Sequence, residues 1–384
     1  MTIFNLSLDQ LRQRRSMKWR AHPEEVLPAW VAEMDCLPAP EVRAALHELI
    51  DLGDTGYPAE KPYEQAYARF AADTWSWEYD WDNNTIIVPD VMQGCAHVIA
   101  AFTDPDSHVV INPPVYPPFF SYPVWQGRQL LQVPLTEQGR LDVPALERAF
   151  AGELGPKPQA YLLSSPHNPH GTVHTADELA AVAAAAARHD VLVVVDEIHA
   201  PFVSRTNALG DPTPHVPYLT VPNTEKAVIV TSASKAWNLA GLKAAIAIGG
   251  TAVAGGLMKF PHEITHSASH LGILAHTVAL NESRQWLGET VAEVEDNRRL
   301  FANLLHEKLP DASYSPGPGT YLAWVDCSGL GLDNPWQTFL DAGKVRLNDG
   351  RTFGPGGEQH VRVNLATSPE IITEVVNRMA AAIR

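Results

Sequence analysis

A series of short apolar, β-branched segments constrains the fold of this chain more than any other feature. Between about residues 85 and 250 such segments alternate with helix-forming stretches, and the run 191–195 is typical of a strand buried on both faces. This alternation predicts a mainly parallel sheet covered by helices. Because ligands of open α/β sheets bind at the carboxyl ends of the strands, the residues that follow these runs are candidates for a functional site.

The segment 231–243 follows one of these runs and contains the strongest candidate, Lys235. Ser232 and Ser234 lie just before this lysine, and Lys243 follows it. Burial and neighbouring cations lower the pKa of a lysine, which makes it a nucleophile and a proton carrier. The pattern favours a Schiff-base lysine beside a phosphate cup, although a serine-rich turn with one solvated lysine has the same composition.

Three other polar residues also follow apolar runs. Asp196 could pair with a protonated pyridine nitrogen or cap a helix. Asn168 could donate to a phenolic oxygen or only form an Asn-Pro-x-Gly turn. Tyr116 could stack on a flat ring or pack within a loop.

Two further groups have the chemistry to bind anions. The amides of Val91 and Met92 precede an apolar helix predicted over 95–102, and amides at the start of a helix bind phosphate well. Arg362 lies in a short late strand, and the planar guanidinium fork fits a carboxylate. Spacing alone also allows an arginine on a surface strand.

The order of these residues along the chain resembles that of the fold-type I enzymes that depend on pyridoxal 5'-phosphate (PLP), the aspartate aminotransferase superfamily. The resemblance covers nearly the whole chain and narrows to the MalY/PatB family of cystathionine β-lyases, also called C-S lyases. The segments that carry this narrower resemblance are 15–19, 27–35, 196–199, 319–324 and 362–366.

The resemblance implies a role for each candidate. Lys235 would hold PLP covalently and then carry the α-proton of the substrate. Asp196 would pair with the pyridine nitrogen, and Asn168 would bind O3′ of the ring. Arg362, helped by the backbone near Ala32, would bind the α-carboxylate of the substrate.

Tyr116 would stack on the ring, and either its hydroxyl or water would be the catalytic acid for the leaving group. His199 would line the cofactor pocket. Tyr57 would reach the phosphate of the neighbouring subunit in a homodimer. The remaining residues implied to hold the phosphate are Val91, Met92, Ser232, Ser234 and Lys243.

Two positions depart from the pattern of the superfamily. Lys243 stands where many members have arginine, so it supplies a point charge without the fork geometry. Asp90 stands where an uncharged residue is expected. Because a carboxylate repels a phosphate, we expect Asp90 to point away from the site or to cap the following helix.

The activity implied is that of a PLP-dependent C-S β-lyase in amino-acid metabolism. Such an enzyme cleaves cystathionine, a precursor in methionine biosynthesis, or related S-substituted L-cysteines. The products are a thiol, pyruvate and ammonia, and the thiol from cystathionine is homocysteine. The alternative is an aminotransferase on the same scaffold, because both reactions begin with removal of the α-proton and no single residue decides between them. A regulatory binding protein is a third possibility, and we expect no added DNA-binding segment.

The length of 384 residues predicts two domains. The resemblance implies that these are a large PLP-binding domain over 40–275 and a smaller, discontinuous α+β domain from 1–39 and 276–384. The net charge of −16 argues against nucleic acids and anionic membranes as partners. Three cysteines form no paired framework and suit a reducing cytoplasm. We also expect no signal peptide and no membrane span.

One motif points to different chemistry. His262, Glu263 and His266 match the HExxH zinc motif, and His270 would extend the same helix face. A chain with 16 histidines produces such a short motif by chance. We interpret this segment as a helix near the dimer interface and the active-site entrance, and we expect no metal.

Overall fold

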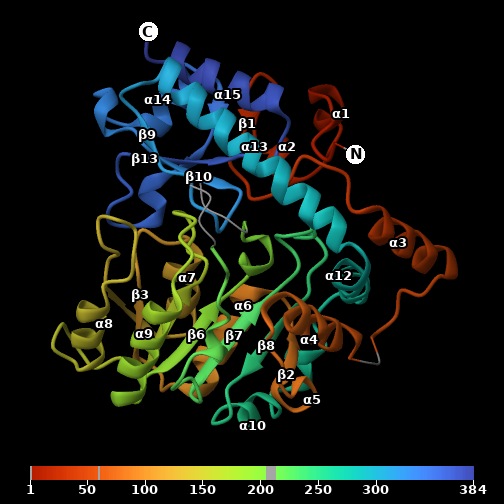
Figure 1. The fold of residues 1–384 in the computed structure, drawn as a ribbon, viewed down its shortest axis with the longest axis vertical. Helices are drawn as coiled ribbons and strands as arrows, with labels where there is room; N and C mark the ends of the chain where they lie inside the picture. Colours follow the sequence, from red (N-terminus) through yellow and green to blue (C-terminus); the bar gives the residue numbers. More distant parts are fainter. Residues whose placement is uncertain (1, 59–60, 205–212) are drawn as a thin grey trace.

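The computed structural model describes residues 2–58, 61–204 and 213–384, and its larger block is built on a seven-stranded sheet (Figure 1). The strand order is β2-β8-β7-β6-β5-β3-β4. The neighbouring strands from β7 to β4 are parallel to one another. Within the described residues of this sheet, β8 is the one strand of opposite direction, antiparallel to both β2 and β7. The prediction of a mainly parallel α/β sheet is therefore confirmed. The strands are β2 (Thr85–Val88), β3 (His108–Ile111), β4 (Gln129–Gln132), β5 (Ala160–Ser164), β6 (Leu192–Asp196), β7 (Ala227–Thr231) and β8 (Ala245–Gly249).

Both faces of the central strands are buried, because alternate side chains point to opposite sides of a strand. On β6, Val193 and Val195 pack in the core formed with α4, α9 and α12, whereas Val194 packs in the core formed with α6 and α7. Every residue of β5, β6, β7 and β8 is buried. The helices are α4 (Pro62–Trp75), α6 (Val91–Phe102), α7 (Pro118–Trp125), α9 (Ala176–Arg188) and α12 (His270–Glu282).

Helix α6 begins four residues earlier than the apolar run predicted. Asp90 is its N-cap, and the Oδ1 atom of Asp90 accepts a hydrogen bond from the Gln93 amide at 2.9 Å. Gly94 lies in the first turn, where an added Cβ would come within 2.8 Å of the Val230 and Val88 side chains. The cap and the missing side chain at Gly94 let the start of the helix lie close against the sheet.

The smaller block contains a four-stranded antiparallel sheet with the order β12-β13-β10-β9. The long helix α13 (Arg284–Lys308) crosses it, and α15 (Pro369–Ala381) packs beside α13 (Figure 1). N-terminal residues Leu11, Trp19 and Leu27 share a core with these elements. The remaining bounds are α1 (Leu8–Arg12), α2 (Met17–Arg20), β1 (Leu27–Pro28), β9 (Ser313–Tyr314), β10 (Leu322–Asp326), α14 (Pro335–Asp341), β11 (Val345–Arg346), β12 (Asn348–Asp349) and β13 (His360–Asn364).

The predicted domain boundary between residues 275 and 276 falls inside α12. This helix packs against α4 and α3 (Pro40–Leu52) of the larger block along its length. The division into two domains at these residues stays a prediction.

The histidine motif does not form one helix. α11 (His262–Thr265) is a single turn, and α12 begins only at His270, so the expectation that His270 extends the same helix face was wrong. The rings of His262 and His266 stack with centroids 3.4 Å apart, and Nε2 of His270 lies 3.3 Å from the Asp54 carboxylate. Within the described residues no three potential ligands gather around a possible metal position, and no helix has the length and apolar character that a membrane crossing needs.

Candidate active site

A cavity of about 260 Å³ lies at the carboxyl ends of β5, β6 and β7, where the larger block meets the smaller one. Parallel strands deliver the residues that follow them to the same sheet edge. Twelve of the thirteen predicted site residues line this cavity. These are Ala32, Val91, Met92, Tyr116, Asn168, Asp196, His199, Ser232, Ser234, Lys235, Lys243 and Arg362.

Lys235 lines the cavity, four residues beyond the end of β7. Its Nζ atom donates a hydrogen bond to the Ala32 carbonyl at 3.1 Å. Desolvation and the nearby Arg362 guanidinium lower the pKa of the lysine to about 8, while Asp196 acts in the opposite sense. A substantial fraction of the lysine is therefore a neutral amine near pH 8, as a Schiff-base nucleophile requires.

Asp196 is the last residue of β6 and is buried at the floor of the cavity. Its Oδ1 atom accepts a hydrogen bond from the Ile198 amide at 3.0 Å, so the side chain does not cap a long helix. Burial raises the pKa of the carboxyl to about 7, and the Ile198 hydrogen bond and Lys235 partly oppose this rise. The site thus holds a carboxyl that would gain from a cationic partner.

Arg362 projects from β13 into the cavity beside Asn168. Nη1 donates to Oδ1 of Asn168 at 2.9 Å, and Nη2 donates to Oδ1 of Asn348 at 2.8 Å. All of these acceptors are neutral, and among the described residues no carboxylate forms a salt bridge with Arg362. Burial lowers the pKa of the guanidinium only to about 10, so it stays a cation. A buried cation without a protein counterion is suited to an anionic ligand.

The cavity wall also carries the groups expected to hold a phosphate. The first residues of α6, Val91 and Met92, lie near Ser234 and Lys243 along its wall. Nζ of Lys243 lies 3.0 Å from Oδ2 of Asp90, whose other oxygen caps α6. Asp90 thus caps the helix, as expected, and also pairs with the cation.

Ser232 is placed differently from Ser234. Its hydroxyl donates to the Ala244 carbonyl at 2.7 Å and accepts from the Ser234 amide at 3.1 Å. This hydroxyl supports the turn that carries Ser234, and its contact with a phosphate stays a prediction.

These groups fit three parts of PLP. The lysine amine fits the aldehyde, and the carboxyl at the end of the neighbouring strand fits the ring nitrogen. The amides, the hydroxyl and the cation at the helix start fit the phosphate. The model of the aminotransferase class I and II family matches residues 32–379. The chain belongs to this PLP-dependent family.

Similar proteins agree with this assignment. The chain is 46% identical to a Mycobacterium leprae protein that carries the provisional name cystathionine beta-lyase, over 98% of this chain and 97% of that protein. It is 33% identical to the cystathionine beta-lyase of Corynebacterium glutamicum, over 98% and 99% of the two chains. A solved structure from Corynebacterium diphtheriae, provisionally described as a PLP-dependent beta-cystathionase, superposes with a TM-score of 0.93 and 31% identity, over 100% of this chain and 99% of that one.

Tyr116 and His199 line the same cavity as Asp196 and Arg362. The Tyr116 amide donates to the Asn168 carbonyl at 3.1 Å, and burial raises the pKa of its hydroxyl, which therefore stays protonated. Burial lowers the pKa of His199 to about 3, so the ring is neutral. Its Nδ1 atom is buried without a partner in the described part of the chain.

Tyr57 is the predicted site residue that does not line the cavity of its own chain. It follows α3, and its side chain is 89% exposed. Its predicted contact with the phosphate of a neighbouring subunit stays a prediction.

Sequence reasoning missed Asn348 and Asn238. Asn348 holds the Arg362 guanidinium, and Asn238 exchanges two hydrogen bonds with the backbone of Met34. Asn348 lies in a short polar stretch whose composition is typical of turns, whereas Asn238 lies between apolar residues and has a positive φ of 58°. The contacts span many residues of chain, so no local pattern indicates them.

Proposed function

We propose that this protein is a PLP-dependent C-S β-lyase that acts on cystathionine or related S-substituted L-cysteines by α,β-elimination. The observation that carries the proposal is that Lys235 and Arg362 line the same cavity. The arginine is an unpaired cation suited to a carboxylate, and the lysine amine lies at the same wall. The similarity to proteins named cystathionine beta-lyase favours elimination over transamination.

Each residue has a defined task in this reaction. Arg362 binds the α-carboxylate and thereby places Cα near Lys235, whose amine removes the α-proton. Bound PLP supplies the electron sink for the negative charge at Cα. Asp196 keeps a proton at the pyridine nitrogen. As the Cβ–S bond breaks, the protonated hydroxyl of Tyr116 donates its proton to the leaving thiolate.

The test is the stoichiometry of the reaction. The purified PLP-loaded protein is mixed with L-cystathionine in the absence of a keto acid, and pyruvate and free thiol are measured. We expect equal amounts of both. Turnover that appears only after a keto acid is added would show that the protein is an aminotransferase.

Arg362→Ala is expected to raise the KM for L-cystathionine by about 10- to 100-fold, because it removes charged hydrogen bonds to the carboxylate. The kcat is expected to fall less. Arg188→Ala is the control, because Arg188 pairs with Glu147 in an exposed position on α9. An unchanged KM in Arg362→Ala would place the carboxylate site elsewhere.

We also propose a homodimer in which Tyr57 reaches the phosphate site of the partner. Ile50, Leu52 and Tyr57 are exposed on one short segment, which supports an interface there.

The three described cysteines are buried and free, which supports a cytoplasmic location.

Subunit mixing tests the trans role of Tyr57. A dimer of one Tyr57→Phe chain and one Lys235→Ala chain contains one site with both native residues only if Tyr57 acts across the interface. We therefore expect mixing of the two weak or inactive variants to restore activity. A fully active monomer in sedimentation would contradict the proposal.

A further inference from the structure

The backbone of residues 30–36, called the strap below, contributes three residues to the cavity wall and contacts both functional cations. The Ala32 carbonyl accepts from Nζ of Lys235 at 3.1 Å and from the Tyr321 hydroxyl at 3.1 Å. The Trp30 carbonyl accepts from Nη2 of Arg362 at 3.4 Å. The position of the strap therefore affects the lysine and the arginine together.

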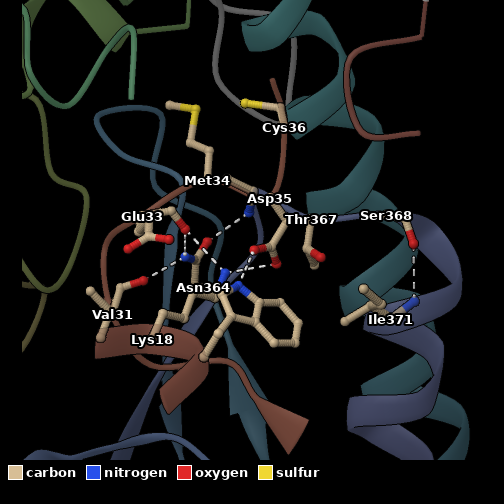
Figure 2. Close-up of polar contacts among 12 residues, drawn as sticks. Lys18, Val31, Glu33, Met34, Asp35, Cys36, Asn364, Thr367, Ser368 and Ile371 are labelled. Atoms are coloured by element: carbon tan, nitrogen blue, oxygen red, sulfur yellow. Dashed lines mark hydrogen bonds and ion pairs between the residues drawn. The ribbon is translucent and has the colours of Figure 1, made fainter. Parts of the chain in front are cut away.

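The strap is anchored from both sides of the site. Nδ2 of Asn364, two residues beyond Arg362 on β13, donates to the carbonyls of Val31 at 2.7 Å and Glu33 at 2.8 Å (Figure 2). In the loop beyond Lys235, Asn238 accepts from the Met34 amide at 2.8 Å and donates to the Met34 carbonyl at 3.0 Å. These bonds join the smaller block and the lysine loop through the strap.

A buried ion pair completes the anchor at the far end of the strap. Nζ of Lys18 lies 2.7 Å from Oδ2 of Asp35, and both side chains are 1% exposed. The same Nζ donates to the Glu33 carbonyl at 3.1 Å (Figure 2). Nε1 of Trp19 donates to Oδ1 of Asp35 at 3.1 Å. The Asp35 amide donates to the Ala366 carbonyl at 2.9 Å.

A buried ion pair is weak evidence for stability, because the loss of hydration offsets most of the attraction between the charges. Both oxygens of Asp35 already have partners within the protein, and neither Lys18 nor Asp35 lines the cavity. The pair is therefore not available for the reaction itself. Lys18 instead contacts the Glu33 carbonyl, one residue beyond the Ala32 carbonyl that binds Lys235.

We propose that Lys18 and Asp35 are positioning residues, which hold the strap so that the Ala32 and Trp30 carbonyls align Lys235 with the carboxylate-binding Arg362. The predicted consequence is a defect in substrate binding and alignment while the phosphate end of the cofactor site stays intact. The kinetic part of this inference rests on the proposed lyase function, whereas the structural part does not.

The test compares two double variants that remove the same pair of charges. In Lys18→Met/Asp35→Asn the oxygen of the new amide can still accept from Trp19, and the loss of the Lys18 ammonium removes the hydrogen bond to the Glu33 carbonyl. In the control, Lys226→Met/Asp190→Asn, the lysine likewise binds a carboxylate at 2.7 Å and a carbonyl at 2.9 Å. That pair is exposed and lies at the opposite edge of the sheet, before β6 and β7.

Three measurements on the full-length variants distinguish positioning from a general loss of structure. Amide hydrogen exchange should be at least about tenfold faster in residues 30–36 and unchanged in β6 and β7. The affinity of the apoprotein for PLP should stay within about twofold of the parent. For L-cystathionine, kcat/KM should fall by about 100-fold, through both a higher KM and a lower kcat, as misplacement of aligned groups by 1 Å can cause.

Each outcome decides the proposal. Unchanged exchange in the strap, or a KM equal to that of the control variant, would overturn it. Faster exchange throughout β6 and β7 together with weaker PLP binding would assign the pair a general structural role instead. If the parent protein does not cleave cystathionine, the lyase function fails, whereas the exchange measurement still decides whether the pair holds the strap.

Discussion

Replacement of Lys235 by alanine is expected to reduce the turnover of L-cystathionine by at least about 10⁴-fold, because one side chain supplies both the covalent attachment and the proton transfer. The visible absorbance of lysine-bound PLP should disappear in the same variant. Initial-rate measurements and an absorbance spectrum of the purified protein check both effects.

Lys235→Arg tests whether the positive charge of the lysine is sufficient or whether a reactive amine is required. Arginine stays protonated, so it neither attacks the PLP aldehyde nor accepts the α-proton, and we expect this variant to be as inactive as Lys235→Ala. Lys226→Ala, which alters an exposed lysine paired with Asp190, is the control and should retain full activity. Full activity in Lys235→Ala would refute the assignment of the site.

The positions of Lys235 and Asp196 could be predicted because the cause is local. Each follows a run of buried β-branched or small apolar residues, and parallel strands bring their carboxyl ends to one edge. The pairing of β6 with β7, which places Asp196 opposite Val230, then sets the lysine loop beside the carboxyl. The fold and the centre of the site therefore follow from patterns within a few residues.

The strap and its anchors could not be predicted in this way. Asn364 contacts a carbonyl more than 300 residues away along the chain, and Asn238 contacts one about 200 residues away. The local sequence around Lys18 and Asp35 contains no sign that the two side chains meet in a buried pair. The break between α11 and α12, which separates His266 from His270, depends likewise on packing that periodicity does not register.

Asp196→Asn is expected to lower kcat for L-cystathionine by about 100-fold or more, because a neutral amide cannot keep a proton at the pyridine nitrogen. The amide should still accept the hydrogen bond from Ile198, so the local backbone is retained. A kcat equal to that of the parent would contradict the pairing role. Steady-state rates at saturating PLP check this effect without a contribution from weaker cofactor binding.

The same substitution should stabilise the apoprotein, in a manner that depends on pH. Burial raises the pKa of Asp196 from 3.8 to about 7, so the folded protein binds this proton more tightly than the unfolded chain does. Ionisation of the carboxyl therefore costs stability that grows as pH rises from about 4 to about 7 and is constant above, on the order of a few kcal/mol. The variant lacks this cost, so its unfolding midpoint should exceed that of the parent apoprotein at pH 8, with a smaller difference at pH 5. Bound PLP should give the parent the higher unfolding midpoint at pH 8, because only the parent then gains the ion pair with the ring nitrogen. The carboxyl destabilises the apoprotein, and its binding of the cofactor explains why the site contains it.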